Sequence, residues 1–305
     1  MIKAKISILI FSYLLTFSSI SQALYKYTPS DVYTETLKIE QKIETIRQYF
    51  KAPKQIVPER LNIQLKPRNS YQKTYEIFVK INILREKNQL PRIEETSVQP
   101  VKDLDPSLVH EQVMRILTEL DIFMTRTGIT QHNKAISQQN NKTPNDVYHL
   151  LDTISSQLDT IIGRSFTPSY VFSQNMRILE DINILLEKLN IHDRSGPPNR
   201  INDATTKDVF DMAIQIMFEI HRLQAMAGVD PVDFTEFSKN NISPTDAFTM
   251  TGMIISGLQP IKAHLMLHKE VTPPARSYKE KRPADALQLL GWCLRKIKQI
   301  RHLNY

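Results

Sequence analysis

The chain has 305 residues, enough for two domains of ordinary size, and carries a formal net charge of +7. Its single cysteine, Cys293, excludes an internal disulfide. With only 7 glycines and no alternating apolar run, the sequence also argues against a β-sheet protein.

The N-terminal residues 1–23 have the pattern of a secretory signal peptide. A basic start with Lys3 and Lys5 precedes an apolar run over residues 6–17, and Ser21-Gln22-Ala23 supplies a small-residue cleavage site. We expect cleavage after Ala23 and a periplasmic mature protein. Retention of the segment as an anchor is the alternative, although the apolar run is short for a membrane span.

A short phrase, Thr28-Pro29-Ser30-Asp31-Val32-Tyr33, recurs through the rest of the chain. Its proline, or an equivalent threonine, occupies positions 29, 67, 106, 144, 168, 206, 244 and 283. The steps are 38 or 39 residues, except for one step of 24 residues in the middle. Two sets of four copies in matching register indicate a tandem duplication.

Each copy has the chemistry of a helix start. Thr or Ser can accept a bond from a free amide of the first turn, Pro needs no donor there, and Asp at the third helical position favours the positive helix end. At offsets 0, 6, 10 and 13 from the last residue of the phrase, nearly every copy carries an apolar side chain. These offsets share one face of a helix, so each copy predicts an amphipathic helix of roughly 20 residues.

In chain order, the predicted helices cover approximately residues 29–50, 67–87, 106–126, 144–164, 168–190, 206–226, 244–268 and 283–302. The predicted fold is all-α, with eight amphipathic helices in two tandem, duplicated four-helix units at residues 24–165 and 166–305. Connections of about 16 residues are long for a helical bundle, and they leave the relative direction of neighbouring helices within a unit open.

No catalytic signature is present. The sequence lacks a serine in a Gly-x-Ser-x-Gly setting, a phosphate-binding glycine loop and a Cys–His motif. The repeated Asp residues are explained by helix capping, and Cys293 occupies a stripe position that is Ile in the other seven copies. We therefore expect a non-enzymatic protein with a buried, unreactive cysteine.

Two groups of residues are candidates for binding a ligand or a metal. The last slot of the phrase holds Tyr33, Tyr71, His110 and Tyr148 in the first unit, where polar-tipped rings could line a ligand pocket. The alternative is that these groups bond to local backbone or water. In the second unit, His264 and His268 lie four residues apart on a predicted helix and could bind Zn²⁺ or Cu²⁺ with further ligands. The alternative is that these histidines only interact favourably with the negative C-terminal end of the helix. No cofactor is otherwise expected.

The C-terminal segment is basic. Residues 269–305 contain nine Lys or Arg against three acidic residues. Within it, Trp292 occupies a mostly polar slot beside Arg295 and Lys296, which suggests either an exposed contact for a partner or burial beneath a connection. The segment could also contact an anionic surface peripherally, or be an ordinary solvated helix face. Export argues against nucleic-acid binding.

These observations predict a periplasmic helical-repeat protein that binds a partner protein or ligand, as an accessory to an envelope or sensory system. The alternative is a helical bundle that binds a small ligand or metal.

Overall fold

The computed structural model describes residues 26–54, 64–130, 134–163, 166–231 and 242–303, and these form an all-α protein. The eight helices of this part of the chain are α1 (Pro29–Tyr49), α2 (Pro67–Lys87), α3 (Pro106–Thr127), α4 (Pro144–Ile162), α5 (Pro168–Lys188), α6 (Thr206–Met226), α7 (Pro244–His264) and α8 (Pro283–Ile297). The predicted all-α class with eight helices is confirmed for the described residues. The predicted signal peptide lies outside the described residues.

The recurring phrase caps the helices. At α1, α4, α6 and α7, a Thr or Ser accepts a bond from the backbone of the Asp three residues later, and that Asp accepts one from the cap amide. At α1, for example, the Thr28 amide donates to the Asp31 carboxylate over 2.8 Å. Helix α5 lacks this cap, because Thr167 makes no side-chain cap bond and Tyr170 stands where α1, α4, α6, α7 and α8 carry Asp. The positive end of α5 is therefore not neutralised by a carboxylate of its own.

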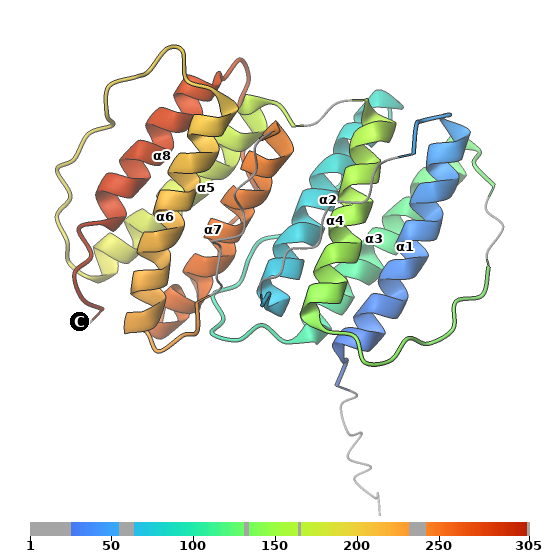
Figure 1. Cartoon of the computed structure of the whole chain (residues 1–305), viewed down its shortest axis with the longest axis horizontal. Coiled ribbons are helices and arrows are strands. Elements are labelled where there is room, and N and C mark those ends of the chain that lie inside the picture. Colours follow the sequence, from blue (N-terminus) through green and yellow to red (C-terminus); the bar gives the residue numbers. More distant parts are fainter. Residues whose placement is uncertain (1–25, 55–63, 131–133, 164–165, 232–241, 304–305) are drawn as a thin grey trace, which may run out of the picture.

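The helices pack as two sets of four (Figure 1). In the first set, α1 and α2 each pack against α3 and α4; in the second, α5 and α6 each pack against α7 and α8. A small apolar hollow at one end of the first set is lined by Pro29, Pro67, Pro106 and Pro144, the first residues of its four helices. The starts of α5 to α8 meet in the same way. All four helices of a set thus run parallel, and the long connections return the chain to the starting end.

The predicted apolar stripe forms the core of both sets. One layer, the sixth residue after the last slot of the phrase, is completely buried in every helix; it comprises Ile39, Ile77, Ile116, Ile154, Ile178, Ile216, Ile254 and Cys293, each 0% exposed. Each large aliphatic side chain of this kind contributes roughly 1.5–3 kcal/mol on burial. Burial also raises the pKa of the Cys293 thiol to about 12, so this cysteine is held in its neutral form.

The two sets meet through α2 and α7, which pack against each other in the middle of the molecule (Figure 1). The helices run antiparallel, since Asn69 at the start of α2 bonds to Ser256 far along α7, while Glu76 further along α2 bonds to Thr249 near the start of α7. Helix α2 is consequently covered on all sides, with every residue from Arg68 to Arg85 buried. The prediction of a single apolar stripe is therefore incomplete for α2, because the second helix set covers the face of α2 that points away from its own set.

Candidate functional site

A cleft of about 480 Å³ opens where the two helix sets and a connecting segment meet. Four parts of the chain line it: α2 with the start of the following connection, the first turns of α5, Phe248 near the start of α7, and residues 275–280 between α7 and α8. Aromatic side chains in the lining are Tyr75, Tyr170, Phe248 and Tyr278. The cleft therefore combines apolar ring surface with polar groups, and its volume lies in the range typical of small-molecule sites.

One wall of the cleft carries an acidic triad. Arg92 pairs with Glu86 at 2.5 Å and with Glu95 at 2.8 Å, so a single guanidinium serves two carboxylates. The Tyr75 hydroxyl donates to Glu95 over 3.1 Å, and burial raises the pKa of this phenol to about 12. With Tyr75 neutral, this wall has an excess negative charge of one.

Another wall is the segment 275–280, which is fastened along its length. The Ala275 amide donates to the Tyr75 hydroxyl over 3.1 Å, the Tyr278 ring contacts the edge of Phe172 at 5.1 Å, and the Lys281 amide donates to the Ser169 hydroxyl over 3.1 Å. Between these fixed points, Arg276, Lys279 and Glu280 are exposed and line the cleft. None of the three has an ion-pair partner among the described residues, which gives this wall an excess positive charge of one.

The α5 wall ends at a buried guanidinium. Tyr170, Ser173 and Gln174 line the cleft, and Arg177 is the next residue along the same helix face. Arg177 is only 2% exposed and stacks on the Tyr75 ring at 4.4 Å. Its Nη1 donates to Gln174 over 2.8 Å, but its Nε and Nη2 have no hydrogen-bond partner and no carboxylate of the described residues lies within ion-pair distance. A positive charge therefore lies unneutralised behind Gln174.

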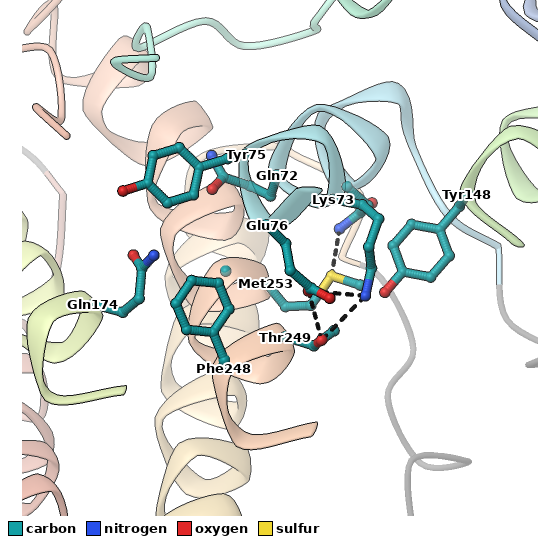
Figure 2. A pocket seen from close by; sticks show the side chains of 11 residues that line it. Gln72, Lys73, Tyr75, Glu76, Tyr148, Gln174, Phe248, Thr249 and Met253 are labelled. Atoms are coloured by element: carbon teal, nitrogen blue, oxygen red, sulfur yellow. Dashed lines mark hydrogen bonds and ion pairs between the residues drawn. The ribbon is translucent and has the colours of Figure 1, made fainter. Parts of the chain in front are cut away.

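A second, much smaller cavity adjoins the cleft (Figure 2). Its volume of about 10 Å³ matches one water molecule. Tyr75, Gln174 and Phe248 line both spaces and so form the partition between them. The Gln72 amide nitrogen, which also lines the inner cavity, has no hydrogen-bond partner in the described structure.

Behind the inner cavity lies what we term the interface network, which comprises Lys73, Glu76 and Lys80 of α2 with Asp152 and Asp159 of α4. Glu76 lies between two ammonium groups, 3.0 Å from Lys73 and 3.6 Å from Lys80. Asp152 pairs with Lys73 at 2.9 Å and Asp159 with Lys80 at 2.8 Å. Lys73, Glu76 and Lys80 are at most 2% exposed, so these charges are almost completely removed from water.

The network connects both helix sets. The Thr249 hydroxyl of α7 donates to Glu76 over 2.7 Å, as Figure 2 shows, and Thr245 donates to Asp159 over 3.0 Å. Burial alone would raise the pKa of Glu76, but Lys73 and Lys80 outweigh it and lower that pKa. Burial likewise opposes the charge of Lys73, yet Asp152 and Glu76 raise its pKa well above the usual value. Lys73 and Glu76 therefore stabilise each other in the charged state, whereas burial outweighs the pair with Lys80 and raises the pKa of Asp159.

The four side chains of the predicted ring pocket lie in separate places in the structure. Tyr33 lies beneath the Lys142 ammonium, 4.6 Å from its ring centre; the Tyr71 hydroxyl donates to the Ser97 carbonyl over 3.2 Å; and His110 stacks on Tyr27 at 3.7 Å. Tyr148 is buried beside Lys73 and lines the inner cavity. Of the four rings, only Tyr148 therefore adjoins the candidate site.

Trp292, Arg295 and Lys296 contact the connection between α5 and α6. The Trp292 indole donates to the Ser195 carbonyl over 2.9 Å, Arg295 donates to the Gly196 carbonyl over 3.1 Å, and Lys296 pairs with Asp193. We call these four side chains, Asp193 included, the loop contact. Trp292 is half-buried beneath the connection and Lys296 is buried, which leaves Arg295 as the exposed member of the predicted group.

The predicted helical pairing of His264 and His268 is wrong. Helix α7 ends at His264, and Met266 turns the chain with a left-handed φ of 58°, so His268 lies beyond the helix. Both histidines are exposed, and the described residues contain no cluster of three or more potential metal ligands. Helix α8 is likewise shorter than predicted, ending at Ile297.

Sequence reasoning missed the interface network, although α2 carries a signal for it. Its apolar residues Tyr75, Phe78, Val79, Ile83 and Leu84 fall on several faces, which is typical of a helix covered all round. Charged residues within such a helix must be paired, so Lys73, Glu76 and Lys80 were candidates for a buried network. The residues that pair with them, Asp152 and Asp159 of α4 and Thr249 of α7, show no sequence pattern that predicts their burial.

Comparison with known protein families, with curated proteins and with solved structures finds no match for this chain. None of the helices in the described part of the chain is long and apolar enough to cross a membrane.

Proposed function

We propose that this chain is a non-enzymatic, exported binding protein that takes a small polar ligand into the cleft between its two helix sets, as an accessory to an envelope or sensory system. The observation that carries the proposal is the cleft itself, where four aromatic rings and unpaired charged side chains line about 480 Å³ at the junction of the two sets. Junctions between packed units are common places for ligand sites.

One feature favours binding over catalysis. The buried titratable groups behind the cleft, Lys73 and Glu76, are bonded to each other and to Thr249, and the cavity beside them has room for only about one water. A substrate would have to displace this packing to reach them. A further hollow of about 600 Å³ beside α1 is lined by polar and charged residues, such as Glu40, Gln41 and Lys54, and no aromatic ring lines it.

The ligand proposal is tested by thermal unfolding of the mature protein with a panel of amino acids, short peptides, sugars and nucleotides, with Zn²⁺ and Cu²⁺ as separate arms. A ligand that binds only the folded state raises the melting temperature in a concentration-dependent way. We expect a shift with at least one polar organic compound. The same shift should vanish in Ser277→Trp, which fills the cleft from an exposed position, and persist in Ser137→Trp, a matched change in the connection before α4.

No shift with any compound in the panel would reject the proposal, and a shift that survives Ser277→Trp would place the ligand elsewhere. A response confined to the metal arms would favour the metal-binding alternative.

Export is tested separately by cell fractionation and by the mass of the mature chain. We expect a protein that begins at Leu24, as the N-terminal pattern indicates. A cytoplasmic chain of full length would reject this part of the proposal.

A further inference from the structure

The charges that line the cleft differ between its walls, and this difference bears on which ligand it accepts. The wall formed by Glu86, Arg92 and Glu95 has one more negative than positive charge, whereas Arg276, Lys279 and Glu280 have one more positive charge. We propose that the cleft binds a dipolar ligand that carries an ammonium and a carboxylate, such as a free amino acid or a short peptide. This inference rests on the proposed function and specifies its ligand.

The positive side is supported by more than exposed side chains. Arg177 lies directly behind Gln174 with two N–H groups unpaired and no counterion of the described residues within ion-pair distance. A guanidinium keeps its charge at all physiological pH values, and a buried charge acts through a medium of low dielectric constant. An anionic group in the cleft near Gln174 would therefore be stabilised by Arg177 without contacting it.

The start of α5 adds to the same side. Thr167, Ser169 and Tyr170 line the cleft, and the first turn of α5 carries no acidic residue. Its positive end is thus available to a ligand anion, as an addition to the charges of Arg276 and Lys279. The ligand carboxylate accordingly lies toward α5 and residues 275–280.

The negative side suits an ammonium group. Glu86 and Glu95 share one guanidinium, and the Glu86 side chain is about half exposed, at 46%. The excess carboxylate charge is therefore accessible from the cleft, while Glu95 is held by Arg92, Tyr75 and Asn82. Between the charged walls, Tyr170 and Tyr278 offer ring surface to an apolar or aromatic side chain of the ligand.

The test measures binding of alanyl-phenylalanine to the full mature chain by isothermal titration calorimetry, beside its N-acetylated and C-amidated forms. The free dipeptide should bind most tightly, with each blocked form weaker by roughly fivefold, the effect of losing one partly exposed charge interaction. Equal binding of all three forms would overturn the inference.

Two charge variants then assign the ends of the ligand. Arg276→Gln/Lys279→Gln should weaken the free dipeptide by roughly fivefold and leave the C-amidated form unchanged. Glu86→Gln should weaken the free dipeptide and leave the N-acetylated form unchanged. Lys298→Gln/Arg301→Gln, which removes two exposed charges beyond the other end of α8, is the matched control and should alter neither.

The failure of this inference can be told apart from failure of the proposed function. If a purely anionic or neutral compound of the panel binds and is blocked by Ser277→Trp while the dipeptide does not bind, the dipolar ligand is rejected and the ligand cleft stands. If no compound binds, both are rejected.

Discussion

The interface network and the loop contact use the same chemistry, lysine paired with carboxylate, but differ in what they join. Glu76 is surrounded by Lys73, Lys80 and the hydroxyls of Ser155 and Thr249, deep between the two helix sets. Asp193 bonds to Lys296 and Gln299 at the edge of the second set and holds only the connection after α5. The first should govern whether the whole molecule is stable, and the second should govern one loop.

The largest effect is expected from Glu76→Gln. This change leaves two buried ammonium groups without their shared counterion, and breaking a buried pair from one side costs about 3–5 kcal/mol. Urea unfolding measures the loss. The matched control is Glu219→Gln, which breaks the partly exposed pair with Arg222 on α6 and should cost about 1 kcal/mol or less.

Replacing the partner as well sharpens the prediction. In Lys73→Met/Glu76→Gln, one of the two ammonium groups that lose Glu76 is itself removed, so the double variant should be more stable than Glu76→Gln alone. A double variant that loses the sum of the two separate changes would show that the ions do not act as a network.

A smaller and local effect is expected from Asp193→Asn. The change removes a charge-assisted bond to Lys296 and should cost roughly 1–2 kcal/mol. Trp292 is the only tryptophan of the chain and bonds to the same connection, so its emission should shift to longer wavelength as the loop loosens. Glu76→Gln should leave the emission of the folded protein unchanged. If both variants shift it equally, the two regions are not independent.

The contrast between these regions also shows which features can be predicted from sequence. Caps and stripes are local, so the start of each helix and its buried layer follow from spacing alone. Whether a residue beside the stripe is buried depends instead on which other helices pack there. Arg177 and Lys38 occupy the same slot of the repeat, yet Arg177 is buried where α5 meets α2 and Lys38 is exposed on α1.

The parallel direction of the helices and the cleft could not be predicted for a related reason. A connection of about 16 residues is long enough to return along a helix or to turn at its end, so the sequence permits both directions. The cleft lining comes from α2, α5, Phe248 of α7 and residues 275–280, which belong to two helix sets that meet where α2 packs against α7. That contact depends on shape and partner charges on different helices, for which no spacing rule exists. Descent of the two sets from a duplication stays a prediction.

The smallest expected effect is the pH dependence of the stability that Asp193 contributes through the loop contact. Burial alone would raise the pKa of Asp193, but bonds from Lys296, Gln299 and Ser195 lower it well below its usual value. A carboxylate whose pKa is lowered by folding stabilises the protein above its unfolded pKa of about 3.9, and this contribution is lost as the pH falls below that value. The stability difference between the natural chain and Asp193→Asn should therefore be constant from pH 7 to about pH 5 and shrink below about pH 4. Urea unfolding at a series of pH values, followed by Trp292 emission, measures it; a difference that stays constant down to pH values far below 4 would show that Asp193 does not act through its charge.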